Sequence, residues 1–333
     1  MIALQVACLK ALVYWPLALE ESKRIIKEGL SNTIEVLWAS STAEAMSLVG
    51  SVEIYIGSAQ NWVLERGERL RFLQVVHAGV DNLDLELARR RGVMIASAKK
   101  VNSFYVAETA LALMLSLAKK ITYFDRLAKN NIFPQYSWEF STDTLRDKTI
   151  IILGYGGIGR ELARLLKPFG VRVIGVKRNP PGGRDPYADL VIGINDLDKY
   201  VGEADFLVVS APLTRETRGL IDLKVISKMK RGSYIINVGR GHVIDERSLH
   251  MALREGMLRG AGLDVWWLYP HRGGDGVYSS TGIHMMDNVI ATPHRGGFVK
   301  EAEIDIARFV VENVKRYLRG EEPEGLVDLK SGY

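Results

Sequence analysis

One stretch, KTIIILGYGGIGR at residues 148–160, constrains the fold of this chain more than any other. A short apolar run leads directly into the pattern G-x-G-x-x-G, and a helical pattern, ELARLLKPFG, follows. In such a strand–turn–helix unit the three glycines permit a sharp turn, the close approach of a pyrophosphate, and tight packing of helix on strand. The first-turn amides and the positive end of the helix dipole then face the anion. The predicted cofactor-binding residues of this turn are Gly154, Tyr155, Gly156, Gly157, Ile158 and Gly159.

Short apolar strands alternate with helical segments through the rest of the chain, which is typical of doubly wound, parallel α/β sheets. Strands of a first sheet are predicted at residues 12–15, 34–38, 53–56, 72–76 and 93–96. Strands of a second sheet are predicted at residues 149–153, 171–176, 189–192, 205–209, 233–238, 260–265 and 289–291. The second set has the number and rhythm of a complete dinucleotide-binding sheet. The segment before Lys10 fits the pattern poorly.

Two long helical segments indicate how the domains connect. Residues 102–130 have apolar residues at helical spacing and are too long for a simple connector. The last helix, residues 301–319, is expected to pack back on the first sheet. We therefore predict two doubly wound domains, with a Rossmann cofactor domain (101–291) inserted into a flavodoxin-like substrate, or catalytic, domain (1–100 and 292–333). The cleft between them is the expected site.

Composition excludes several classes of protein. The 333 residues are 47% hydrophobic and 25% charged, as in soluble globular proteins of about two domains. The single cysteine, Cys8, excludes an internal disulfide and a cysteine-based zinc site, which favours a cytoplasmic location. The net charge of +5 comes without a dense Lys/Arg block, so no nucleic-acid partner is expected. Residues 1–19 lack the basic start of a signal peptide, and no apolar run is long enough for a membrane span.

Further motifs occur in a fixed order between about residues 55 and 320. They are HAGVDNLDL at 77–85, YVAETALALML at 105–115, ADFLVVSAPLTRETRGLID at 204–222, MKRGSYIINVGRGHVID at 229–245, GAGLDV at 260–265 and NVIATPH at 288–294. In order and spacing the chain resembles the D-isomer-specific 2-hydroxyacid dehydrogenases, a family that includes glyoxylate reductases, phosphoglycerate dehydrogenases and formate dehydrogenase. The resemblance implies hydride transfer between NAD(P)(H) and a small 2-hydroxy or 2-keto acid of the glyoxylate or hydroxypyruvate type. It also implies a homodimer.

The resemblance assigns roles to individual residues. It implies that Arg240 is the catalytic arginine, His294 the catalytic histidine and Asp264 the aspartate that contacts the nicotinamide. The remaining residues that it implies are Pro212 and Val238 for the cofactor, and the backbone of Ala78, Gly79 and Val80 for the substrate carboxylate. An ordinary strand-to-helix turn with Asp81 as helix cap is the alternative reading of the last group.

The chemistry of carbonyl reduction supports two of these roles independently. The carbonyl oxygen needs a proton donor, for which histidine is suited near neutral pH. The substrate needs a fixed cation, which a planar guanidinium supplies bidentately. Arg240 and His294 each follow a predicted strand, and the carboxyl ends of such strands face the ligand crevice. An isolated arginine or histidine after a strand is more often solvated or structural. A catalytic role is therefore assigned only because the strand-end position and the family motif agree.

The end of the strand VRVIGV departs from the NAD pattern. An acidic residue about 20 residues beyond the first glycine usually binds the ribose 2′-hydroxyl. Here Lys177, Arg178 and Asn179 follow instead. Because cations attract a 2′-phosphate, we predict NADP(H) as the preferred cofactor and NAD(H) as a possible one. The alternative is that both cations are solvated and either cofactor binds.

A second departure concerns the partner of the histidine. Family members usually carry a glutamate five residues after the Asp264 position, and here that residue is Tyr269. A phenol can exchange a hydrogen bond with imidazole, but it lacks the charge that favours imidazolium. We therefore predict Tyr269 as a weak orienter of His294 and a lower optimum pH for reduction. Alternatively, Tyr269 only packs the loop with Trp266 and Trp267.

The missing glutamate keeps two other functions open. One is a dinucleotide-sensing interaction protein with weak catalysis. The other is chemistry similar to that of formate dehydrogenases, which also lack the glutamate. The glycine-rich segment 271–287 is predicted as a surface loop. Its His271 and His284 have no ligand set at metal spacing beside them, so no metal site is predicted.

Overall fold

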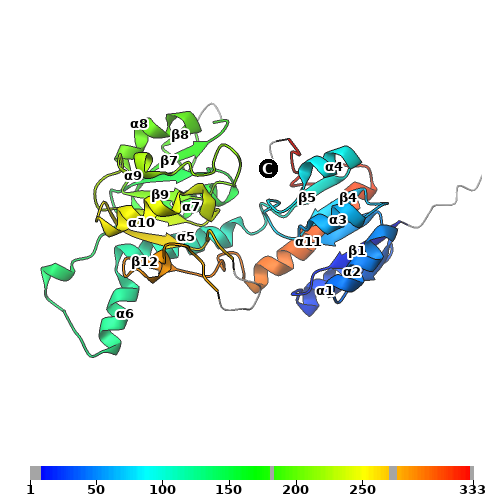
Figure 1. Ribbon diagram of the computed structural model, residues 1–333, viewed down its shortest axis with the longest axis horizontal. Helices are drawn as coiled ribbons and strands as arrows, with labels where there is room; N and C mark the ends of the chain where they lie inside the picture. The colour runs from blue at the N-terminus through cyan, green and yellow to red at the C-terminus, as the bar shows by residue number, and fades with distance from the viewer. Residues whose placement is uncertain (1–8, 181–183, 270–275, 331–333) are drawn as a thin grey trace, which may run out of the picture. The chain divides into compact units, whose positions relative to one another are not determined.

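The chain forms two compact units in the computed structural model, which describes residues 9–180, 184–269 and 276–330 (Figure 1). One unit contains the chain up to Asn102 and again from Phe298, and the other is Ser103–Gly297. The return to the first unit comes six residues later than we expected. Thr292 hydrogen-bonds to the end of β11, and Arg295 and Gly296 hydrogen-bond to Asp264 directly after it, so these residues stay with the second unit. The segment before Lys10, apart from Leu9, and His271 lie outside the described residues.

The first unit is a five-stranded parallel sheet with the strand order β2-β1-β3-β4-β5. This is the order of flavodoxin-like folds, so the predicted fold class is confirmed. Its strands are β1 (Lys10–Tyr14), β2 (Glu35–Trp38), β3 (Ile54–Gly57), β4 (Phe72–Val75) and β5 (Met94–Ser97). Its helices are α1 (Glu20–Leu30), α2 (Thr42–Leu48), α3 (Asn61–Arg66), α4 (Leu85–Arg91) and α11 (Lys300–Leu318). The sequence reading missed α3, a helix of only six residues.

Hydrophobic side chains cover both faces of this sheet. Leu12 and Tyr55 belong to one buried cluster, whereas Ala11 and Ile54, one position away on the same strands, belong to the other. The second cluster includes α11, which packs against α1 and β4, and Tyr317 of α11 stacks on Phe72 with ring centroids 4.6 Å apart. The C-terminal helix is therefore an integral part of the first unit.

The second unit is a seven-stranded parallel sheet with the order β12-β11-β10-β9-β6-β7-β8. Counted from β6, this is the 3-2-1-4-5-6 order of dinucleotide-binding folds, with one more strand. The strands are β6 (Thr149–Leu153), β7 (Arg172–Lys177), β8 (Leu190–Gly193), β9 (Phe206–Val209), β10 (Ser233–Asn237), β11 (Leu258–Leu263) and β12 (Val289–Ala291). The helices are α5 (Ser103–Ala118), α6 (Ile121–Lys129), α7 (Gly157–Leu166), α8 (Leu197–Tyr200), α9 (Leu223–Ile226) and α10 (Glu246–Arg254).

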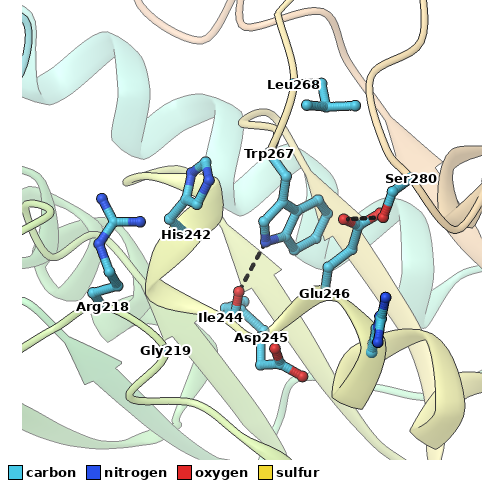
Figure 2. Close-up of a pocket in the computed structure, with 10 residues that line it drawn as sticks. Arg218, Gly219, His242, Ile244, Asp245, Glu246, Trp267, Leu268 and Ser280 are labelled. Carbon is cyan, nitrogen blue, oxygen red and sulfur yellow. Dashed lines mark hydrogen bonds between the residues drawn. The ribbon is translucent and has the colours of Figure 1, made fainter.

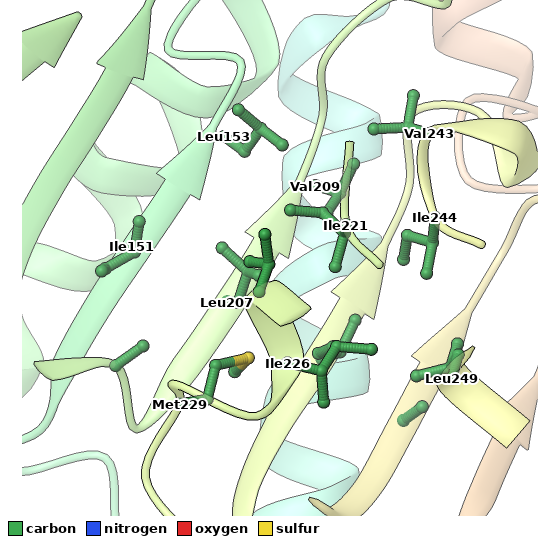
Figure 3. Packing of buried hydrophobic residues seen from close by; sticks show 14 of the residues in the cluster. Ile151, Leu153, Leu207, Val209, Ile221, Ile226, Met229, Val243, Ile244 and Leu249 are labelled. Atoms are coloured by element: carbon green, nitrogen blue, oxygen red, sulfur yellow. The ribbon is translucent and has the colours of Figure 1, made fainter. Parts of the chain in front are cut away.

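Two hydrophobic clusters enclose the second sheet as well. Along β6, Ile151 and Leu153 face the cluster shown in Figure 3, whereas Ile150 and Ile152 face the opposite one. A parallel strand buried on both faces reads as a continuous apolar run, which is why the sequence identified β6 without ambiguity. The glycine turn follows this buried strand directly.

The helical segment predicted at 102–130 is two helices rather than one. It breaks at Lys120, whose φ of 50° is left-handed, and α6 starts at the next residue. α6 contains no buried residue, and Figure 1 shows it extending away from the sheet of its own unit together with the chain that follows. We refer to residues 121–140 as the arm. Phe133, Tyr136 and Trp138 in the arm are 78%, 90% and 90% exposed.

Candidate functional site

Glycine is suited to each of the three positions in the turn after β6 for a different structural reason. Gly154 has a φ of 99°, and a Cβ there would lie 2.4 Å from the Ala211 nitrogen. A Cβ at Gly159 would lie 2.7 Å from the Gly154 oxygen, so α7 could not pack as closely on β6. A Cβ at Gly156 would meet no atom within 4 Å among the described residues. Open space at the second glycine is what a pyrophosphate would fill, so the turn fits a dinucleotide.

The start of α7 provides the anion-binding end. The helix begins at Gly157, and no side chain in the described part of the chain caps it. Its first-turn amides therefore have no partner within the helix and carry its partial positive charge. The Tyr155 side chain, in contrast, is buried against Gly175 and donates a hydrogen bond to Asp185 Oδ1 at 2.7 Å. Burial, and then the Asp185 carboxylate, raise the pKa of the Tyr155 phenol.

Gly156→Val is expected to weaken dinucleotide binding at least about tenfold while it changes the free energy of unfolding by about 0.5 kcal/mol or less. The added Cβ would enter the open space of the turn, with no atom of the described residues within 4 Å. Gly154→Ala is the contrasting variant and should destabilise the fold by about 1–3 kcal/mol, because its backbone is left-handed and crowded. Fluorescence titration with NADH and urea unfolding measure the two effects. Unchanged affinity in Gly156→Val would place the cofactor elsewhere.

The end of β7 carries the two cations singled out above. Lys177 is the last residue of β7, and both Lys177 and Arg178 are exposed. Arg178 Nε lies 3.2 Å from Glu216 Oε2. Glu216 was not predicted as a site residue, because it is distant in sequence and only the strand order brings it to this place.

The loop after β9 is fixed to the glycine turn and to itself. Ser210 donates its hydroxyl hydrogen bond to the Gly154 oxygen at 3.0 Å. Thr217 donates to the Pro212 oxygen at 2.6 Å, so the predicted cofactor residue Pro212 has a braced backbone. Val238, after β10, is 4% exposed and donates its backbone hydrogen bond to Val209. These contacts connect the carboxyl ends of the neighbouring strands β6, β9 and β10.

Arg240 follows β10 and is held by a buried amide. The Asn237 side chain is fully buried, donates to the Arg240 oxygen at 3.0 Å and accepts from the Gly239 nitrogen at 3.1 Å. Arg240 Nη1 donates to the Gly239 oxygen at 2.8 Å. Asn237 was not predicted as a site residue, although a polar residue at the end of an apolar strand was the available signal.

Asp264 organises the turn that carries His294. The aspartate is 2% exposed, and its Oδ1 accepts hydrogen bonds from the Thr292 hydroxyl at 2.7 Å and the Arg295 nitrogen at 2.9 Å. Its Oδ2 accepts from the Gly296 nitrogen at 2.9 Å. His294 itself has a φ of 55°, which is uncommon for residues other than glycine and persists only where the surroundings impose it. The Asp264 carboxylate thus supports a strained turn.

Tyr269 contacts the histidine through its ring. The ring centroids of Tyr269 and His294 lie 5.5 Å apart at an interplanar angle of 47°. The Tyr269 oxygen accepts a hydrogen bond from the Trp266 nitrogen at 3.2 Å. Trp266 and Trp267 are both buried, and their indole nitrogens donate to the oxygens of Thr292 and Ile244. The aromatic loop after β11 is therefore packed around the turn that carries His294.

In the first unit, Ala78, Gly79 and Val80 lie in the loop after β4, separated from its end by two residues. Val80 is buried, and Ala78 and Gly79 are partly exposed. The alternative that made Asp81 a helix cap is wrong, since Asp84 caps α4 by accepting from the Leu87 nitrogen at 2.9 Å.

A pocket of about 370 Å³ lies between the loops that follow β9, β10 and β11 (Figure 2). It is lined by Arg218, Gly219, His242, Ile244, Asp245, Glu246, Arg247, Trp267, Leu268 and Ser280. None of the residues predicted to bind cofactor or substrate lines it. Partial burial, and then the Arg218 guanidinium, lower the pKa of the His242 imidazole.

His284, which the sequence raised as a metal ligand, lies in an aromatic environment. His284 lies edge-on to Trp266 and Tyr278, with ring centroids 6.0 and 5.7 Å away. No cluster of three or more His, Cys, Asp or Glu side chains suited to a metal ion occurs in the part of the chain that the structure describes. Among the same residues, the helices are too short or too polar to cross a membrane.

Arg240, His294 and the glycine turn follow three parallel strands of one sheet, and therefore share its carboxyl edge. This fold and this edge define a dinucleotide-binding α/β protein. The sequence matches the model of the D-isomer specific 2-hydroxyacid dehydrogenase, NAD binding domain, over residues 111–296. The chain belongs to the D-isomer-specific 2-hydroxyacid dehydrogenase family, as its motifs predicted, and is an NAD-dependent oxidoreductase.

Named relatives agree with this assignment. The chain is 33% identical over 273 residues to a glyoxylate reductase of Pyrococcus furiosus, covering 80% of this chain and 78% of that protein. It is 32% identical over 277 residues to a D-3-phosphoglycerate dehydrogenase of Methanocaldococcus jannaschii, covering 80% of this chain but only 49% of that protein. The crystal structure of a D-isomer specific 2-hydroxyacid dehydrogenase family protein from Aeromonas salmonicida superposes with a TM-score of 0.82 at 27% identity, over 97% of this chain and all of that one. These relatives do not favour the sensing or formate alternatives.

Proposed function

We propose that the chain reduces a small 2-keto acid of the glyoxylate or hydroxypyruvate type to the 2-hydroxy acid. The observation that carries this proposal is the His294 turn, which is strained and held by a buried carboxylate at the same sheet edge as the glycine turn and Arg240. Backbone strain of this kind clusters at active sites. We assign dinucleotide binding to the second unit and the substrate-domain role to the first.

Each residue has a defined task in this proposal. A bound dinucleotide supplies the hydride for the carbonyl carbon. His294 donates the proton that the carbonyl oxygen takes up, and receives it back in the reverse direction. Arg240 binds and polarises the substrate through its guanidinium, with its backbone fixed by Asn237. Asp264 was predicted to contact the nicotinamide, and we propose that it also positions His294.

Two further residue groups complete the proposal. Tyr269 orients His294 through the ring contact. The backbone amides of Ala78, Gly79 and Val80 bind the substrate carboxylate, as the resemblance implies.

For the cofactor, we propose that both NADH and NADPH bind and that Lys177 and Arg178 favour NADPH. Both cations are exposed at the end of β7, where a 2′-phosphate would meet them. Arg178 in particular offers a planar guanidinium, which binds phosphate bidentately. A strong preference for NADH would contradict this assignment.

The decisive experiment is a panel of 2-keto acids, with glyoxylate and hydroxypyruvate first, assayed with NADPH and with NADH. Reduction of at least one of these two acids, faster than that of bulkier 2-keto acids, is the expected result. Absence of turnover with every acid and both cofactors would contradict the proposed reaction. Formate is included as a control donor and should not reduce the bound cofactor.

We also propose a cytoplasmic homodimer. The single cysteine supports the compartment. The exposed aromatic residues of the arm support a second copy as its partner, because exposed apolar surface of this kind marks interaction sites.

Replacing Phe133, Tyr136 and Trp138 together by serine should convert the dimer to a monomer in sedimentation velocity, since aromatic anchors dominate interface energies. Leu17→Ser, at a residue of the first unit that is 61% exposed, is the control and should leave the dimer intact. A wild-type protein that is monomeric at micromolar concentration would contradict the proposal.

A further inference from the structure

The ion pair between Arg178 and Glu216 joins the two loops that flank the glycine turn. Arg178 follows β7, and Glu216 lies in the loop after β9. β7 and β9 are the two neighbours of β6 in the sheet. Adjacent strands lie about 4.8 Å apart, so the pair bridges roughly 10 Å across the end of β6. The strand between the two partners is thus β6, whose end carries the predicted pyrophosphate site.

The ion pair between Arg178 and Glu216 is weak enough for another anion to replace Glu216. The side chains of Arg178 and Glu216 are 45% and 63% exposed, and ion pairs at such exposure contribute little to stability. The residues next to the pair in the sequence include Lys177, the last residue of β7, and Arg215, and both are exposed cations. Glu216 therefore occupies the guanidinium of Arg178, and an anionic ligand of Arg178 would have to compete with it.

We propose that Glu216 sets the balance between NADPH and NADH by competing with the 2′-phosphate for Arg178. This inference rests on the dinucleotide site of the proposed function. A phosphate carries between one and two negative charges near neutral pH, and a guanidinium binds it bidentately. When the phosphate takes Arg178, Glu216 loses its partner and repels the phosphate. With NADH the ion pair between Arg178 and Glu216 persists. The Glu216 carboxylate then lies near the end of β7, where the strand itself has no acidic residue.

Binding of two fragments tests the inference without any turnover. 2′,5′-ADP and 5′-AMP differ only in the 2′-phosphate, and calorimetry gives both dissociation constants. Glu216→Gln keeps the shape of the side chain and removes its charge. We expect it to tighten 2′,5′-ADP binding by about three- to tenfold, while the affinity for 5′-AMP changes less than about twofold. Unchanged affinity for 2′,5′-ADP would overturn the inference.

A double-mutant cycle shows whether Glu216 acts through Arg178. In the Arg178→Gln background, Glu216→Gln should change 2′,5′-ADP affinity by less than about twofold. An equal gain in both backgrounds would overturn the competition. Glu255→Gln is the charge-matched control, because Glu255 follows α10 and precedes the amino end of β11, whereas the glycine turn follows the carboxyl end of β6. If Glu255→Gln tightened 2′,5′-ADP binding by a similar factor, the effect would come from the net charge of the protein. That result would also overturn the inference.

Failure of the inference and failure of the proposed function give different results. A wild-type protein that binds both fragments but reduces no 2-keto acid would contradict the proposed reaction alone. A wild-type protein that binds neither fragment would overturn both the dinucleotide site and this inference.

Discussion

His294→Asn is expected to lower the turnover of 2-keto acid reduction by about 10²- to 10⁴-fold, which is the usual contribution of a positioned proton donor. Asparagine tolerates a positive φ, so it suits the left-handed backbone that His294 adopts at a φ of 55°. It keeps a polar side chain but has no proton to release near neutral pH. The loss should therefore appear in turnover, with dinucleotide affinity changed less than about twofold.

Steady-state kinetics at saturating cofactor and a fluorescence titration of NADPH measure the two quantities. His250→Asn is the matched control, since His250 lies on α10 and has no assigned role. It should change turnover less than about twofold. Wild-type activity in His294→Asn would remove the histidine from the mechanism and leave its strained turn without a catalytic explanation.

The glycine turn was the most predictable part of the site, because its pattern and the apolar strand before it are local in the sequence. Gly159 is needed where its Cβ would meet Gly154, five residues away, and the buried run of β6 identified the strand. The alternation of strands and helices likewise predicted two doubly wound parallel sheets, whereas the order of the strands comes from the structure. The family motifs then placed Arg240 and His294 at strand ends, as the structure shows them.

The parts that sequence reasoning missed depend on contacts between distant loops. The Arg178–Glu216 pair exists because β7 and β9 flank β6, which no local pattern reports. The Asp264 carboxylate was assigned to the nicotinamide, and its bonds to the turn around His294 became visible only once β11 and β12 lay side by side. The break between α5 and α6 at Lys120 could not be predicted, because no glycine or proline marks it in the sequence. Periodicity predicts elements, whereas positioning contacts arise from their packing.

Asp264→Asn is expected to lower the free energy of unfolding by about 1–3 kcal/mol and turnover by about 10- to 100-fold. The carboxylate accepts from three donors, two of them the backbone nitrogens of Arg295 and Gly296. An asparagine offers one acceptor oxygen and one donor group, so in either orientation at least one backbone N–H faces a donor. The position is 2% exposed, and water cannot compensate. The turn would then relax and misplace the His294 imidazole.

Thr292→Val separates this positioning role from a contact with the nicotinamide. It removes one hydrogen bond of the Asp264 carboxylate, from the Thr292 hydroxyl at 2.7 Å, and leaves the carboxylate itself in place. If Asp264 acts by holding the turn, Thr292→Val should lower turnover by about three- to tenfold with unchanged dinucleotide affinity, in the same direction as Asp264→Asn. If Asp264 acts only on the cofactor, Thr292→Val should have wild-type turnover and Asp264→Asn should raise the dissociation constant for NADH. Stopped-flow turnover and equilibrium titration on both variants, well below their unfolding transitions, distinguish the two outcomes, because loss of stability alone would alter neither the turnover nor the affinity of the folded fraction.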